Sequence, residues 1–155
     1  MRCRCFSFFR SFGIEIASVI DMNNRILITA ERKENALPLS LLLESHHYHV
    51  CVVERSFQAV EKIRNHHATL KPFDLLIAGT LLSTRSLWKM FLELEKIDMN
   101  LPFIVISDNE QTRLMKRLLD RGFYGYIVRP FDSVALLNSV MNILRNIRKY
   151  RRQIR

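Results

Sequence analysis

The chain has 155 residues, of which 48% are hydrophobic and 25% are charged. These values are typical of one soluble globular domain, and no uninterrupted apolar run approaches the ~20 residues that cross a bilayer. The three cysteines, Cys3, Cys5 and Cys51, lack the paired spacing of a disulfide framework or a zinc site. That cysteine usage favours a reducing, cytoplasmic setting.

Short apolar strands alternate along the chain with segments of helical periodicity. Residues 1–24 differ from the rest, and we expect a poorly ordered or non-native extension there. In chain order, the predicted elements are a strand at 25–30, a helix at 36–47, a strand at 50–53, a helix at 56–67, a strand at 73–80, a helix at 86–97, a strand at 102–107, a helix from 108 or 109 to 121, a strand at 126–128 and a helix from 132 or 133 to 144.

The predicted helix at 36–47 carries Leu37, Leu41 and Glu44 on turn spacing, with Asn35 as a candidate cap. Proline is tolerated only in the first turn of a helix. Because of Pro38, we expect this helix to begin late or to bend.

Other caps and core positions follow from the same patterns. Ser56 is the expected cap of the second helix, and Gly122 is expected to end the fourth. The last helix is expected to turn five residues inward: Val134, Leu137, Val140, Met141 and Leu144. Four large aromatic residues are expected in the core: Phe57, Trp88, Phe91 and Phe103.

The order of elements predicts an α/β fold. Strict alternation with short connections implies a doubly wound parallel sheet of five strands, with helices on both faces and right-handed crossovers. In such sheets the working site lies at the C-terminal ends of the strands. The residues at those ends include Ala30, Glu31, Gly79, Ser107 and Arg129.

Three segments of the chain resemble the receiver domain of two-component response regulators, over about residues 25–144. Residues 73–79 resemble the strand that normally ends in the phosphoacceptor aspartate. Residues 101–107 resemble the strand that ends in the signalling Ser or Thr, and residues 125–131 resemble the strand with the switch aromatic and the Lys-Pro-Phe motif. The resemblance implies a flavodoxin-like or CheY-like (βα)5 fold and a part in two-component signalling.

The site residues that the resemblance implies depart from the family pattern. Gly79 stands where the family has the acceptor aspartate, and Ala30 and Glu31 stand where it has an acidic pair. Arg129 replaces the family's lysine, whereas Ser107 and Tyr126 match. Aspartyl phosphorylation requires a carboxylate nucleophile and a divalent cation, so we expect no phosphoacceptor, no bound Mg²⁺ and no other cofactor.

Two alternatives at the strand ends follow from the same residues. Asp74 lies about 16 Å before the strand tip, at ~3.3 Å per residue, so it is not expected to replace the missing nucleophile. Arginine offers a planar fork that suits a carboxylate. We therefore hypothesise that Arg129 pairs with Glu31.

The resemblance also implies a partner-binding face on the fourth helix, the last strand and the last helix, across which self-association is expected. The residues assigned to it are Leu114, Arg117, Leu118, Arg121 and Tyr126. The histidines at 46, 47, 49, 66 and 67 are interpreted as solvated loop residues and not as metal ligands.

Six of the nine net positive charges belong to a basic helical tail at residues 145–155. Its members are Arg145, Arg148, Lys149, Arg151, Arg152 and Arg155. A solvated helix end is the simplest interpretation, and contact with nucleic acid or an anionic membrane is the alternative.

These observations favour a non-enzymatic pseudo-receiver that acts through protein contacts independently of aspartyl phosphorylation, with no small-molecule substrate. Two alternatives remain open: a functional phosphorelay receiver, and a basic adaptor for nucleic acid or a membrane surface.

Overall fold

The computed structural model describes residues 24–79, 82–98, 100–108, 112–120 and 125–153. The predictions for residues 1–23, for a helix cap at Asn109 and for a helix end at Gly122 lie outside these ranges. The described elements, in chain order, are β1 (Arg25–Thr29), α1 (Lys33–Ser45), β2 (His49–Val53), α2 (Ser56–His67), β3 (Leu75–Ala78), α3 (Thr84–Ile97), β4 (Phe103–Ser107), α4 (Thr112–Leu119), β5 (Gly125–Val128) and α5 (Ser133–Gln153).

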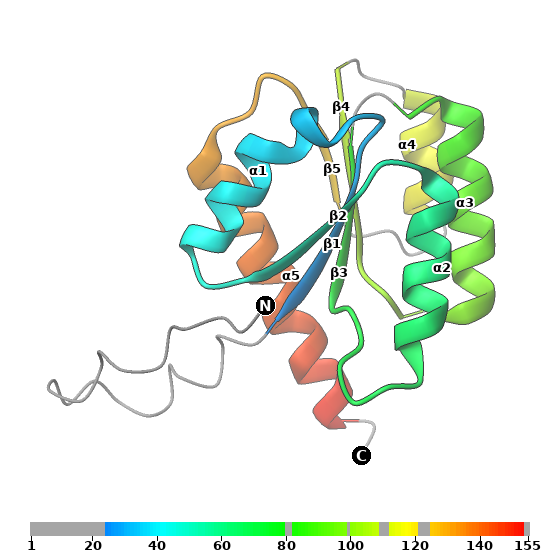
Figure 1. Cartoon of the computed structure of the whole chain (residues 1–155), viewed down its shortest axis with the longest axis vertical. Coiled ribbons are helices and arrows are strands. Elements are labelled where there is room, and N and C mark those ends of the chain that lie inside the picture. Colours follow the sequence, from blue (N-terminus) through cyan, green and yellow to red (C-terminus); the bar gives the residue numbers. More distant parts are fainter. Residues whose placement is uncertain (1–23, 80–81, 99, 109–111, 121–124, 154–155) are drawn as a thin grey trace, which may run out of the picture.

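The five strands form one sheet in the order β2-β1-β3-β4-β5, and every adjacent pair is parallel. The predicted doubly wound α/β fold is therefore confirmed. Helices α1 and α5 cover one face of the sheet, and α2, α3 and α4 cover the other (Figure 1). The strand order reverses direction between β1 and β3, which is where sheets of this type place their sites.

Alternation along the strands divides the core between the two faces. On β1, Leu27 packs with α2 and α3, whereas Ile26 and Ile28 pack with α1 and α5. The whole of β3 is buried, as its continuous apolar sequence predicts.

Helix α1 differs from its prediction. It begins at Lys33, its N-cap is Arg32 and not Asn35, and Pro38 lies inside it. The proline ring faces solvent, so the backbone carbonyl that loses a partner on that side can be hydrated.

The buried face of α1 also differs from the expectation. It consists of Ala36, Leu39, Ser40 and Leu43. Leu37 and Leu41, the two leucines that the sequence places on turn spacing, are 54% and 57% exposed. Leu39 and Leu43 pack beneath the helix with two small residues, and Leu37 and Leu41 lie on another side.

Two further core predictions were wrong and one cap was confirmed. Phe57 is 52% exposed and Val134 is 61% exposed, and each lies in the first turn of its helix. Ser56 is the first helical residue, not the cap, which is Arg55. At α5, the carboxylate of Asp132 accepts from the backbone N–H groups of Val134 and Ala135, as a cap should.

Candidate functional site

The C-terminal ends of the central strands enclose a small cavity. Ala30, Glu31, Gly79 and Arg129 line it together with Asn35 of α1 and apolar residues of the core. The sequence-predicted strand-end residues therefore come together, except Ser107, which does not line the cavity. The cavity volume is about 10 Å³, close to the minimum that holds one water molecule.

Gly79 lies against β1. Its backbone N–H donates to the carbonyl oxygen of Thr29 over 2.6 Å. A Cβ atom at this position would lie 2.8 Å from that oxygen and 3.2 Å from the Cβ of Ala30. Glycine is thus required here by lack of space, and any side chain would displace the backbone of β1 or β3.

The small residues at the two strand tips explain this close approach. Thr29 pairs with Ala78 in the parallel register, so the next residues, Ala30 and Gly79, face each other just beyond the ladder. Neither carries a side chain larger than a methyl group, and the strands close over the place that the family resemblance assigns to the acceptor.

The charged residues around the cavity do not form the predicted pair. Glu31 is exposed and Arg129 is half-buried, but no salt bridge joins them among the described residues. Instead, the backbone N–H of Arg129 donates to the carbonyl of Ser107 over 2.8 Å. Within the described ranges, no three His, Cys, Asp or Glu side chains are grouped as metal ligands would be.

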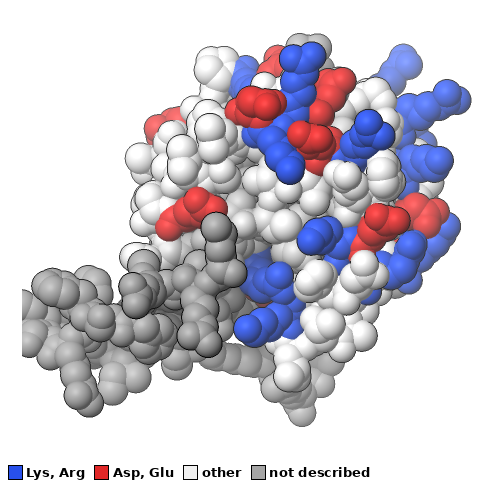
Figure 2. Space-filling view, in the orientation of Figure 1, with Lys and Arg blue, Asp and Glu red and all other residues white. Residues whose placement is uncertain are grey.

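Charges of both signs surround the strand ends. Acidic and basic side chains gather at the upper end of the molecule in Figure 2, where β1, β2 and β3 finish. A surface of mixed sign does not concentrate divalent cations as a carboxylate cluster would.

Asp74 lies at the opposite end of the sheet, as its spacing from Gly79 predicts. Its carboxylate accepts from the backbone N–H of Arg25 at 2.9 Å, and its own N–H donates to the carbonyl of Arg25. It therefore joins β1 and β3 at their entry and takes no part in the strand-end site.

Thr29 is a feature that the sequence did not reveal. Its side chain is fully buried, and its hydroxyl has no hydrogen-bond partner within the part of the chain that is described. A buried hydroxyl without a partner costs free energy. Threonine is common in strands, so nothing in the sequence distinguished this position.

The predicted partner face is only partly exposed. Leu118 is completely buried and belongs to the core, so its assignment to an exposed face was wrong. Tyr126 is half-buried against the same core cluster. The side chain of Leu114 and the whole of Arg121 lie outside what is described.

Arg117 contacts α3. Its guanidinium carbon lies 4.2 Å above the ring centre of Trp88, a favourable cation–π geometry. Trp88 stacks on Phe91, and Phe91 meets Phe103 edge to face. Arg117 thus connects α4 to an aromatic row that reaches β4, a contact that depends on helix packing and has no local sequence signal.

The basic tail continues α5. This helix runs to Gln153, and Ile147 within it is buried. Arg145 and Lys149 are exposed, whereas the side chains of Arg148, Arg151 and Arg152 and the whole of Arg155 are outside the description. No helix among the described residues is long and apolar enough to cross a membrane.

The histidines occupy helix ends and the start of β2. Four of the five are exposed, and His66 is half-buried beside the ring of Phe73 at 5.4 Å. His67 lies 3.6 Å from the carboxylate of Asp98. They are surface and packing residues in this arrangement.

Comparison with known proteins agrees with the fold. The family model described as response regulator receiver domain matches residues 26–141. The Arabidopsis thaliana two-component response regulator ARR10 is 24% identical over 132 residues, which cover 85% of this chain and 23% of that protein. The putative two-component response regulator-like APRR4, from the same plant, is 23% identical over 127 residues, covering 82% of this chain and 42% of the relative. The chain thus spans less than half the length of either relative.

Solved structures share the fold. A CheY-like receiver domain from Methanospirillum hungatei superposes with a TM-score of 0.69 at 21% identity, covering 82% of this chain and 98% of that one. A receiver domain from Clostridium thermocellum gives a TM-score of 0.73 at 15% identity, with the same coverage. At these identities the likeness supports the arrangement of strands and helices alone.

Proposed function

Because this chain belongs to the response regulator receiver domain family, we propose that it is a signalling module that acts through protein contacts without being phosphorylated on aspartate. The observation that carries the proposal is the close approach of Gly79 to the Thr29 carbonyl. An acyl phosphate requires a carboxylate at the strand tip, and here the tip has neither a side chain nor the space for one.

The surroundings of Gly79 support the same proposal. A transferred phosphoryl group needs a divalent cation to neutralise its oxygens, and Mg²⁺ is usually held by one or two carboxylates. Among the described residues, Glu31 is the one acidic residue that lines the cavity. The cavity volume of about 10 Å³ is close to the minimum that holds one water molecule.

The contact surface that we propose for the signalling partner is centred on α4 and β5. Arg113 and Lys116 of α4 are exposed, and Tyr126 of β5 is half-buried. Tyrosine and arginine are enriched among the residues that dominate the binding energy of protein interfaces. Arg117 is not included, because it is engaged with Trp88.

Titration with beryllofluoride and Mg²⁺, which together mimic an aspartyl phosphate, tests the proposal. The full chain is expected to show no saturable binding by calorimetry, while a receiver domain with an acceptor aspartate serves as the positive control. Saturable binding that is lost in Glu31→Gln would favour a functional phosphorelay receiver instead.

A further inference from the structure

Strand β2 forms an edge of the sheet, and its outer side is open. Among the described strands, β2 pairs only with β1, and it lies in front of the other strands in Figure 1. The backbone N–H of His49 donates to Asn24, and the carbonyl of Val53 accepts from Ala30. Since backbone groups alternate in direction along a strand, those of Val50 and Val52 point away from the sheet.

This edge lacks the usual protection against pairing. Natural edge strands carry charged side chains, proline or a bulge that blocks association. The sequence of β2 is His-Val-Cys-Val-Val, and three of its residues, Val50, Cys51 and Val52, are half-buried. Cys51 and Val52 line an open depression of about 490 Å³, together with Glu61, Lys62 and other residues of α2.

Helix α1 adds an exposed stripe on the same side of the molecule. Lys33, Leu37, Leu41 and Glu44 recur every three or four residues and therefore share one side of the helix. All four are exposed. Lys33 lines the depression beside β2. Asn35 lies about 160° round the helix from the stripe, at ~100° per residue. It lines the strand-end cavity. The stripe therefore faces the open edge and not α5.

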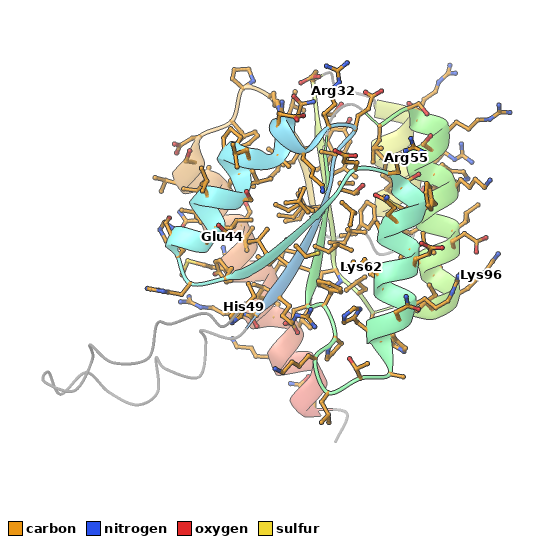
Figure 3. All side chains as sticks on the ribbon, viewed as in Figure 1. Arg32, Glu44, His49, Arg55, Lys62 and Lys96 are labelled. Carbon is orange, nitrogen blue, oxygen red and sulfur yellow. The ribbon has the colours of Figure 1, made fainter. Side chains whose placement is uncertain are left out.

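The two charges of the stripe are poorly placed within a single chain. Lys33 lies in the first turn of α1 and Glu44 in the last, and each opposes the helix macrodipole at its end. Figure 3 shows Glu44 on the flank of α1, at the same end of the molecule as His49. An antiparallel copy of the helix would bring each charge to one of opposite sign.

We infer that β2 and α1 form a symmetric interface with a second copy of this chain. The two β2 strands pair in antiparallel fashion around a two-fold axis at Cys51, the middle residue of β2. Val50 then exchanges backbone hydrogen bonds with the partner's Val52, and Val52 does so with the partner's Val50. The outward direction of these backbone groups fits this register, since directly opposed residues in antiparallel strands exchange both bonds.

The same symmetry makes the helices complementary. The α1 helices lie antiparallel on one side of the joined sheet, where Leu37 and Leu41 are covered by the same residues of the partner. Lys33 faces the partner's Glu44, and this ion pair occurs twice. Shape, charge and backbone direction thus favour a second copy over an unrelated extended peptide, which would leave the leucine stripe uncovered.

This inference does not depend on the proposed signalling role. Strand β5 forms the opposite edge of the sheet, so pairing through β2 leaves α4 and β5 accessible. Beryllofluoride binding would overturn the proposed function without affecting the dimer, and a monomeric chain would overturn the dimer without affecting the proposed function.

Sedimentation velocity of the full chain tests the interface. We expect a concentration-dependent species with twice the 18.4 kDa mass of one chain. Leu41→Glu is expected to raise the dimer dissociation constant about tenfold or more, since two symmetry-related sites lose apolar contact at once. Leu70→Glu is the matched control, because Leu70 is fully exposed in the α2–β3 loop, and it should leave the constant unchanged.

A charge exchange tests the register of the helices. Lys33→Glu and Glu44→Lys should each weaken the dimer, and the double variant should restore it, because both ion pairs re-form with reversed signs. A merely structural effect on α1 would not be rescued in this way.

Cys51 tests the position of the two-fold axis in a Cys3→Ser, Cys5→Ser chain. Opposed residues of a non-hydrogen-bonded pair have Cα atoms about 4.5 Å apart, within the disulfide range of about 4.4–6.8 Å. Diamide, which accepts two electrons and two protons from the two thiols, should give a covalent dimer. A monomer at every concentration, or a dimer that is neither weakened by Leu41→Glu nor crosslinked through Cys51, would overturn the inference.

Discussion

The backbone N–H of Gly79 donates to the carbonyl of Thr29 over 2.6 Å, and this contact closes the strand tips at the centre of the sheet. The sheet and helices of the receiver family are retained, and a Cβ atom at residue 79 would lie 2.8 Å from the Thr29 carbonyl oxygen. The fold therefore leaves little room for a side chain at this tip.

Substitution of Gly79 should be costly and should not create an acceptor. Gly79→Ala is expected to lower the free energy of unfolding by about 1–3 kcal/mol, as overpacking does, because the new Cβ would meet a backbone oxygen at 2.8 Å. Gly79→Asp should be at least as destabilised and should gain no mass on incubation with acetyl phosphate. Urea denaturation and intact mass spectrometry are the measurements.

Gly125→Ala is the control for this series. Its added Cβ would meet the Ile104 side chain at 3.3 Å, which can adjust more easily than backbone. If Gly79→Ala proved as stable as Gly125→Ala, the strand tips would have more room for a Cβ atom than the 2.8 Å contact implies.

Thr29→Val should stabilise the protein. The valine methyl replaces a buried hydroxyl that lacks a partner among the described residues, and the free energy of unfolding should rise by about 1 kcal/mol. Thr69→Val is the contrasting variant, because the exposed Thr69 hydroxyl donates to the carbonyl of His66 and should not gain stability. A loss of stability in Thr29→Val would show that the hydroxyl has a partner.

The contact between Arg117 and Trp88 should be measurable as stability. Arg117→Met keeps much of the apolar stem but removes the cation over the ring, and we expect a loss of about 0.5–1 kcal/mol. Arg113→Met, at an exposed position on the same helix, should change the free energy of unfolding much less. Equal losses in both variants would attribute the effect to helix propensity.

Tyr48 should make stability fall at high pH. Burial raises the pKa of the Tyr48 phenol, and the charge of Arg145 opposes this only in part. A group whose pKa is higher in the folded state contributes stability below its unfolded pKa of about 10 and loses it as the pH rises through the folded value. Tyr48→Phe should therefore show a smaller loss of stability as the pH rises above about 10. An unchanged pH profile would contradict this.

The sheet was predictable because β3 and β4 are apolar on both faces, and only a doubly covered parallel sheet accommodates such strands. The approach of Ala30, Gly79 and Arg129 also followed from topology, since parallel strands end at one edge. What the sequence could not supply was the distance between β1 and β3, which depends on backbone packing. That distance decides how much room a side chain at residue 79 would have.

The prediction for helix α1 failed for a different reason. Its periodicity was read from Leu37 and Leu41, whereas the sheet is covered by Ala36, Leu39, Ser40 and Leu43. Two stripes of similar spacing coexist on one helix, and hydrophobicity alone selected the wrong one. The interaction of Arg117 with Trp88 lay beyond sequence reasoning, because it depends on how α3 and α4 pack.

Trp88 is the single tryptophan of the chain, and the cation above it is carried by α4. A cation held against an indole ring changes its emission, so the intrinsic fluorescence of the unlabelled protein depends on where α4 lies relative to α3. Displacement of that helix by a bound partner is expected to appear as a spectral shift, and binding at the opposite, β2 edge is expected to leave the spectrum unchanged. The protein therefore carries an optical probe that distinguishes occupation of its two surfaces in a single titration.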